Sequence, residues 1–196
     1  MLHVIALVAS LQMVVVTTPD WKATSGTLQR YERTPAKAEW RAVGDPIPVV
    51  VGRNGLAPES EKHEGDGKSP AGVYRIGTAF GFAPSSDFRL PYRQLRETTE
   101  CVDDAASRFY NTIVDRDRVP AVDWSSSEKM RSIREYVWGA VIESKKGSCI
   151  FLHVWGGPHS TTAGCAAMRE DDLLTLLRWL DPAKKPVIES RPSRPR

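Results

Sequence analysis

The sequence predicts a mainly β protein with a few helices, an α+β fold in which the clearest helix comes near the end of the chain. Short apolar runs separated by turn residues dominate the first three quarters, with a turn about every 8 to 12 residues. A broad leucine stripe at helical spacing appears only at residues 169–180. Of the 196 residues, 41% are hydrophobic and 26% are charged, which is typical of one soluble globular domain with its own core.

Strands are expected where valine-rich or alternating runs lie between turn residues. Valine dominates residues 12–17 and 47–51, and residues 27–33 alternate between an exposed and a covered face. The turn signals between them include Gly44-Asp45-Pro46 and the stretch 52–55. Further strands are expected at residues 72–76, 136–143 and 148–155, the last two being neighbours joined by a charged turn.

Two segments have helical character. Residues 125–136 begin with serines that can cap a helix, followed by Glu128, Lys129 and Met130. Residues 169–180 are clearer because their acidic first turn suits the positive end of a helix dipole. Asp181-Pro182 ends this second helix.

The two ends of the chain differ in composition from the middle. Residues 1–16 are mostly apolar, too short for a membrane span, and fit either a degenerate signal segment or a first strand. Both interpretations stay open. One domain is expected over residues 12–190, and the proline- and arginine-rich residues 191–196 are expected to be disordered.

The charge balance and the cysteines limit the partners and the compartment. Lysine and arginine exceed the acids by only 27 to 24, and no basic stripe with interleaved aromatics is present, so a nucleic-acid partner is not expected.

Three cysteines leave at least one thiol unpaired within the chain. Cys101 and Cys149 can form a disulfide with Cys165 free, or all three can be reduced thiols.

The chemistry is concentrated in residues 151–168, FLHVWGGPHSTTAGCAAM. A strand presents His153, a loop follows, and Cys165 comes a few residues before the last helix. A thiol before a helix N-terminus lies near amide donors and a positive dipole that stabilise a thiolate and hold an oxyanion. A histidine on the adjoining strand can act as general base and acid. From spacing alone, a buried thiol with an unrelated histidine is the simpler explanation of the pattern.

Metal binding is an alternative for the same segment. His153, His159 and Cys165 are evenly spaced, and a loop can bring three ligands together. Zinc sites more often have gaps of two to five residues between paired ligands. A zinc-dependent peptidase is therefore the weaker hypothesis, and His159 is more simply an exposed loop residue.

Three motifs together resemble the L,D-transpeptidase (YkuD-like) family. His153 and the stretch Thr162-Ala163-Gly164-Cys165 resemble its catalytic motif, a histidine followed by a loop ending in Ser/Thr-His-Gly-Cys. Residues 65–74 are similar to its upstream Ser/Thr-Pro-x-Gly-x-aromatic strand, and residues 101–115 to a divergent branch of the family. The resemblance covers roughly residues 45–180 and keeps the family's order of motifs.

The resemblance implies an L,D-transpeptidase-like β-sandwich whose C-terminal helix follows the catalytic cysteine loop. It implies Cys165 as nucleophile, His153 as base, no metal and no organic cofactor. The substrate class implied is the stem peptide of peptidoglycan, processed through a thioester. An exported protein of the periplasm or cell wall is expected, and separately a monomeric state. The acyl group then passes to an amine, giving a cross-link, or to water, giving carboxypeptidase activity.

Other site residues follow from the same resemblance or from their place beside the motif. Backbone groups of Gly164 and Ala163 are expected at the oxyanion site, and the carbonyl of Val154 is expected to orient the His153 ring. Candidates for substrate binding are Thr162, Ser160, Trp155, Asp104, Asn111 and Tyr74.

The chain departs from the family pattern at two positions. Ala163 replaces the histidine beside the nucleophile, and Ala167 replaces an arginine often found two residues after it. These changes put the acceptor in doubt. They also keep open a second hypothesis, a peptidoglycan-binding module that retained the fold without turnover.

Overall fold

The structure is a computed structural model and describes residues 9–193. In this part of the chain it is mainly β, as predicted, and it has one helix of more than four residues. The elements in chain order are β1 (Gln12–Thr18), β2 (Ser25–Glu32), β3 (Arg41–Val50), β4 (Leu56–Pro58), β5 (Ser69–Gly81), β6 (Tyr92–Gln94), β7 (Thr99–Val102), β8 (Ile113–Asp115), η1 (Arg116–Arg118), β9 (Ser127–Lys129), η2 (Met130–Ser132), η3 (Arg134–Val137), β10 (Trp138–Ile142), β11 (Phe151–Val154), β12 (Ala166–Met168), α2 (Glu170–Trp179), η4 (Pro182–Lys184) and β13 (Val187–Pro192).

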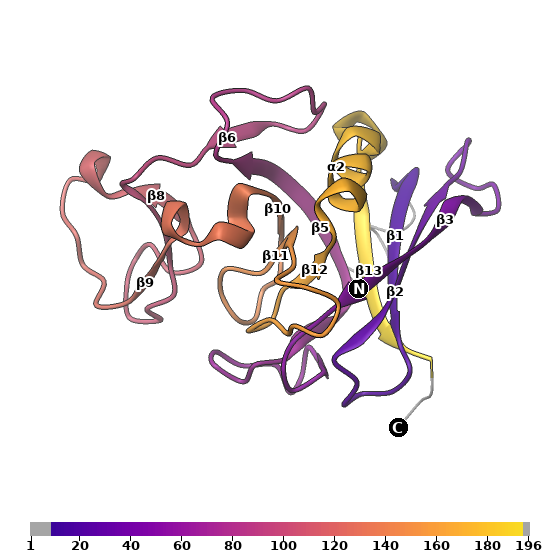
Figure 1. Ribbon diagram of the computed structural model, residues 1–196, viewed down its shortest axis with the longest axis horizontal. Coiled ribbons are helices and arrows are strands. Elements are labelled where there is room, and N and C mark those ends of the chain that lie inside the picture. Colours follow the sequence, from indigo (N-terminus) through magenta and orange to yellow (C-terminus); the bar gives the residue numbers. More distant parts are fainter. Residues whose placement is uncertain (1–8, 194–196) are drawn as a thin grey trace.

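The main sheet is strongly curled and meets itself. Its strands follow the order β10-β11-β12-β3-β2-β1-β13-β5-β4, with β6 beside β5. Because β5 pairs with β13 and also with β10, the two layers of the predicted sandwich are continuous through β5. The curled strands enclose the main core, and β11 and β12 lie at the centre of the molecule (Figure 1).

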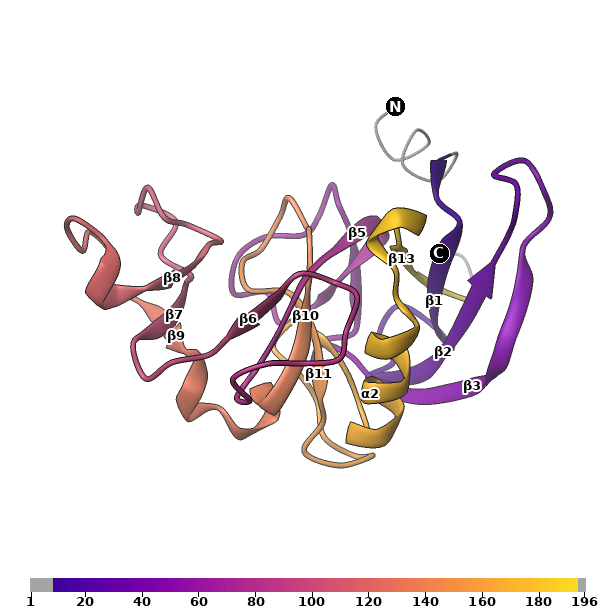
Figure 2. The ribbon, with the colours of Figure 1, turned by 90° about the horizontal axis from the view of Figure 1, so that it is seen from above.

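Helix α2 fills the inside of the curled sheet. Its buried side chains Leu173, Leu176 and Leu177 join a cluster with residues from both layers, such as Val14 and Leu152. Because every third or fourth residue of α2 is apolar, one face of the helix can be buried completely. In Figure 2, which views the molecule from above, α2 lies between β10 and β3. Among the described residues, no helix has the length and apolar character that crossing a membrane requires.

A small three-stranded sheet stands apart from the main one. Its order is β8-β7-β9, and both pairings are antiparallel. Figure 1 shows it at one side of the molecule, beyond β10 and β11. A disulfide joins Cys101 in β7 to Cys149 just before β11. This covalent link fixes the small sheet to the strand that carries His153.

The structure differs from the sequence predictions in one predicted helix and at the two ends of the chain. Residues 125–136 are not a helix but β9 followed by two short 3-10 turns, because β9 pairs with β7 and Met130 is buried beneath it. Strand β13 runs through Pro192 beside β1, so Arg191 and Pro192 are ordered by backbone pairing and not disordered. Residues 12–16 form a strand, whereas 1–8 and 194–196 lie outside the described residues.

Reduction of the disulfide is expected to lower the stability of the protein. The two cysteines are 48 residues apart, and closing a loop of that length restricts the unfolded chain by about 4 kcal/mol. Thermal unfolding with and without a reductant measures the effect. The double variant Cys101→Ser/Cys149→Ser is the control: it should unfold at the temperature of the reduced protein and show no response to the reductant. A wild-type midpoint that ignores the reductant would contradict the prediction.

Candidate active site

His153 is held in the middle of the main sheet. On β11 it pairs with Gly139 of β10 on one side and with Ala167 of β12 on the other. Gly139 is required there, since a Cβ at this position would come within 2.4 Å of the Phe80 ring. A neighbour without a side chain thus lets β10 and β11 approach closely and fixes the backbone of His153.

The His153 ring is oriented by its own strand. Nδ1 lies 2.7 Å from the carbonyl oxygen of Val154. A carbonyl can only accept, so Nδ1 carries the proton and Nε2 presents a lone pair. Burial lowers the pKa of His153, with the hydrogen bond to Val154 and the charge of Glu135 opposing the shift. The ring is therefore neutral near pH 7 and able to accept a proton at Nε2.

Cys165 is placed by the loop that leads into β12. Its carbonyl oxygen accepts hydrogen bonds from Ser69 Oγ at 2.8 Å and from Thr162 Oγ1 at 2.7 Å. Its Sγ donates to the carbonyl of Cys149 at 3.3 Å and accepts from the Phe151 amide at 3.2 Å. The sulfur thus lies against the start of β11, the strand of His153.

The thiol is protonated in this resting structure. Cys165 is only 5% exposed, and burial raises the pKa of its thiol, with the charge of Glu128 adding to the shift. The expected stabilisation by a helix dipole is wrong in this fold, because β12 separates Cys165 from the first turn of α2 at Glu170. Stabilisation of a thiolate must therefore come from the side chains around Cys165 or from bound substrate.

Cys165 and His153 line one cleft of about 410 Å³. The walls come from the loop 155–165, from the segment before β5, and from the small sheet with the turns that follow it. The residues that line it are Arg53, Lys62, Glu64, Gly65, Asp103, Glu128, Ile133, Glu135, Tyr136, Ser148, Cys149, Ile150, His153, Trp155, Gly156, Ser160, Thr161, Thr162, Ala163, Gly164, Cys165 and Ala167. A free thiol and a neutral imidazole therefore face one space of a size suited to a peptide.

Comparison with known families assigns the fold. The family model described as the L,D-transpeptidase catalytic domain matches residues 27–188, which include both His153 and Cys165. The chain belongs to the L,D-transpeptidase catalytic domain family. None of the curated proteins matches it. One solved structure that does match is the helical cell shape determining protein Pgp2 from Campylobacter jejuni, at 14% identity and a TM-score of 0.45. That match covers 95% of this chain, which spans only 52% of the length of the Pgp2 chain.

Several predicted residues of this L,D-transpeptidase domain do line the cleft. Trp155, Ser160, Thr162, Ala163 and Gly164 border it together with the thiol. Thr162 and Ser160 have local bonds as well, because Thr162 Oγ1 donates to the Cys165 carbonyl and Ser160 Oγ donates to the Gly157 carbonyl. The Gly164 amide donates to Thr162 Oγ1 at 3.1 Å, so this donor shapes the loop and is not directed at an oxyanion.

Three other predicted residues are not among those that line the cleft of the L,D-transpeptidase domain. Tyr74 is buried in the main core, and its hydroxyl donates to the Ala71 carbonyl. Asp104 accepts hydrogen bonds from the backbone amides of Ser125 and Ala106, which makes it a turn-forming residue. Asn111 receives the Cys149 amide and donates to the Ser144 carbonyl, so it holds the chain beside the disulfide. A sequence does not separate such structural hydrogen bonds from substrate contacts.

The sequence patterns did not predict the charged residues that line the cleft. Glu128, Glu135 and Arg53 all face the space in front of the thiol. Lys62 does so as well, although its ammonium is buried and paired with Asp66 at 2.7 Å. These four charged residues lie outside the three motifs by which the chain resembles the family. Their proximity arises from the disulfide-linked sheet and from the turn before β5, which no local pattern encodes.

The structure gives no support to a metal centre in this L,D-transpeptidase domain. Among residues 9–193, no three side chains of the ligand types His, Cys, Asp and Glu are grouped to hold an ion. His153 is engaged with Val154, and His159 is an exposed loop residue outside the cleft lining.

Proposed function

We propose that this domain is a cysteine acyltransferase that acts on the stem peptides of peptidoglycan. The observation that carries the proposal is the shared cleft, where the one free thiol of the chain and an imidazole with an available Nε2 lie together. The family match supports the reaction class, and the matched residues 27–188 include both His153 and Cys165. Because peptidoglycan lies outside the cytoplasm, the proposal includes export to the periplasm or cell wall. A monomeric state stays a prediction.

The chemistry follows from the two side chains. Nε2 of His153 takes the proton from Sγ as the sulfur attacks the carbonyl of the third stem residue, and later gives it to the leaving amine. The terminal D-amino acid leaves, and the acyl group stays on Cys165 as a thioester. An amine of a second stem, or water, then attacks the thioester and frees the thiol. Since the resting thiol is neutral, proton removal must accompany the attack.

A cationic residue is proposed for the carboxylate of the acyl donor. Ala167, which replaces the arginine frequent in this family, is buried and lines the cleft without offering a charge. Arg53 lines the same cleft and is exposed, whereas the other cation, Lys62, is already paired with Asp66. Arg53 is thus the side chain best suited to bind a carboxylate, since its guanidinium can form two parallel hydrogen bonds.

Muropeptide analysis tests the proposed function directly. Purified peptidoglycan is incubated with the protein, digested to muropeptides and analysed by mass spectrometry. We expect loss of the terminal D-residue from tetrapeptide stems, with either cross-linked dimers or free tripeptides as products. The ratio of the two products identifies the acceptor as amine or water. An unchanged muropeptide profile with folded protein would contradict the proposal.

The buried, protonated thiol favours one second candidate, a peptidoglycan-binding module without turnover. Such a module would use the cleft for recognition alone, and binding would not depend on the sulfur. Sedimentation with purified sacculi compares the wild type with Cys165→Ala. Equal binding of both proteins, combined with an unchanged muropeptide profile, would favour the module over the enzyme.

A further inference from the structure

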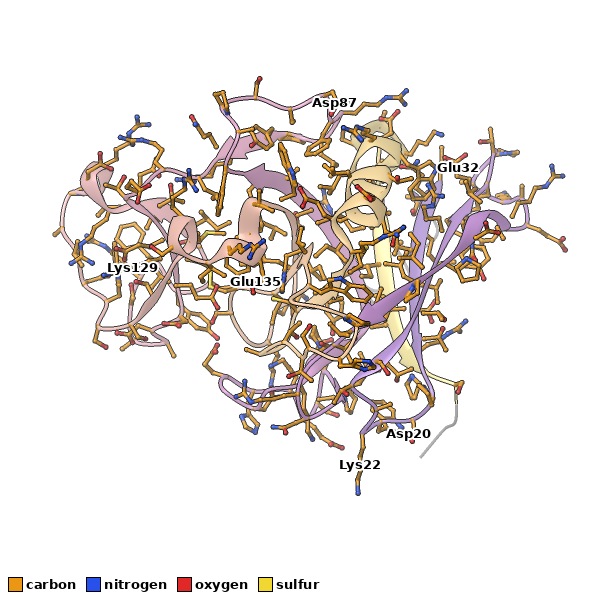
Figure 3. The ribbon with its side chains drawn as sticks, viewed as in Figure 1. Asp20, Lys22, Glu32, Asp87, Lys129 and Glu135 are labelled. Atoms are coloured by element: carbon orange, nitrogen blue, oxygen red, sulfur yellow. A yellow bond between two sulfur atoms is a disulfide. The ribbon has the colours of Figure 1, made fainter. Side chains whose placement is uncertain are left out.

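A tyrosine and a glutamate border the nucleophile in the cleft. The hydroxyl of Tyr136 donates to Glu128 Oε2 at 2.7 Å, and both residues line the space that contains Cys165 and His153. Figure 3 labels their neighbours in sequence: Lys129 lies on the small sheet and Glu135 on the segment that leads toward β10. The pair therefore joins the small sheet to the active-site wall.

The ring of Tyr136 packs against His153 and against Phe151, the residue whose amide contacts the sulfur of Cys165. Its centroid lies 5.3 Å from that of His153, with the two rings nearly perpendicular at 73°. It lies 5.4 Å from the ring of Phe151, whose amide donates to Sγ. Tyr136 is itself buried and lines the cleft, so packing restricts the position of its hydroxyl.

The two groups act on the thiol in opposite directions. After burial, the charge of Glu128 is the next largest cause that raises the pKa of Cys165, whereas the Tyr136 hydroxyl, which can donate to the sulfur in place of Glu128, lowers it. Burial also raises the pKa of Glu128 to about 7, and the hydrogen bond from Tyr136 opposes that shift. The carboxyl therefore changes its charge in the neutral range.

We propose that Glu128 and Tyr136 are positioning residues that control the proton on Cys165, an inference that rests on the function proposed above. With Glu128 ionised, the Tyr136 hydroxyl is held by the carboxylate, and the negative charge opposes a thiolate. With Glu128 protonated, that charge is gone and the hydroxyl is free to donate to the sulfur. The S–H bond then breaks, its proton passes to Nε2 of His153 and the electron pair stays on sulfur. The O–H bond of Tyr136 remains intact throughout.

Other charged groups face this pair from neighbouring elements. Those with an electrostatic effect on Glu128, Tyr136 or Cys165 are Glu64, Asp103, Glu135 and Lys62, with the His153 ring in contact. Glu64 and Asp103 raise the pKa of Glu128, and Glu135 raises that of Tyr136. Lys62 lowers the pKa of the thiol, and its own charge is balanced by Asp66. Glu128 differs from these groups because it accepts the hydrogen bond from Tyr136.

Alkylation of Cys165 tests the inference without any peptidoglycan. The rate of reaction with iodoacetamide is followed by intact-protein mass spectrometry from about pH 5 to about pH 9, on either side of the neutral range. Cys165 is the free thiol, since the other two cysteines form the disulfide. In the wild type, the logarithm of the rate should rise with pH but flatten near pH 7, where the new charge on Glu128 raises the pKa of the thiol.

The variant Glu128→Gln is the decisive comparison. Glutamine keeps an acceptor for the Tyr136 hydroxyl and carries no charge, so it imitates the protonated acid at every pH. We expect its rate to match the wild type at low pH, to lack the flattening, and to exceed the wild type about tenfold above pH 7, as a coupling of one pKa unit gives. Tyr136→Phe should react more slowly than the wild type while keeping the flattening.

A matched control separates this role from loss of any acid in the cleft. Glu135→Gln removes a carboxylate that lines the same cleft without the bond to Tyr136, and its profile should keep the flattening. Thermal unfolding verifies that each variant is folded. A Glu128→Gln profile identical to that of the wild type would overturn the inference, as would a Cys165 that resists alkylation at every pH in both proteins. The alkylation assay uses no peptidoglycan. Its outcome therefore does not depend on whether the protein acts on stem peptides.

Discussion

Replacing Cys165 with alanine is expected to abolish the change in muropeptides, by more than about a thousandfold in rate. No other free thiol exists to take over the attack, because Cys101 and Cys149 are joined. The substitution also leaves the Phe151 amide without its sulfur acceptor, which costs about 1 to 3 kcal/mol of stability. The measurement is the rate of D-residue release, with thermal unfolding alongside it.

The variant Cys165→Ser serves as the matched control for this first prediction. Serine restores an acceptor for the Phe151 amide but is a much weaker nucleophile, so stability should recover while the activity stays lost. Turnover by Cys165→Ala within tenfold of the wild type would show that the sulfur does not carry the reaction.

Replacing His153 with glutamine is expected to lower the rate by about 10² to 10⁴, because the base that removes the thiol proton is lost. The pH dependence gives a second readout. The ring must be neutral to accept a proton, and burial lowers the pKa of His153 below its usual 6.5. Wild-type activity should therefore persist below pH 6.5 and fall only as the pH drops through this lowered pKa. The variant should lack that acidic fall.

A histidine outside the cleft lining provides the control for this second prediction. His63 is exposed, its ring contacts the backbone carbonyl of Glu64, and it should be replaceable by glutamine with no change in rate or in pH profile. Equal losses in His63→Gln and His153→Gln, or an acidic fall that survives in His153→Gln, would argue against His153 as the base.

Local sequence patterns predicted the parts of the fold that depend on local physics. Valine-rich runs became β1 and the end of β3, and the amphipathic stretch with its acidic first turn became α2. The segment 125–136 was misassigned because its capping serines suit a helix, while pairing of β9 with β7 and burial of Met130 decide its structure. Long-range pairing of this kind leaves no periodic signal in a short segment.

The candidate site was predictable only where a motif marks it. His153 and Cys165 were proposed from their motif, and the structure places both in one cleft, with the Val154 carbonyl against His153 Nδ1. Glu128 and Tyr136 were missed because they belong to the misassigned segment and reach the thiol only through tertiary packing. The prediction of a thiolate beside a helix dipole was wrong for a similar reason. The residues between Cys165 and α2 form a strand that pairs with β11, so the thiol is not at the helix N-terminus.

The proposed function requires that Cys165 attacks a carbonyl although its thiol is buried and protonated at rest. Intact-protein mass spectrometry after incubation with a carbapenem, followed by peptide mapping, measures this directly. We predict one adduct per chain, carried by the peptide that contains Cys165 and absent from Cys165→Ala. A folded wild-type protein that keeps its unmodified mass, or an adduct on any other residue, would contradict the account.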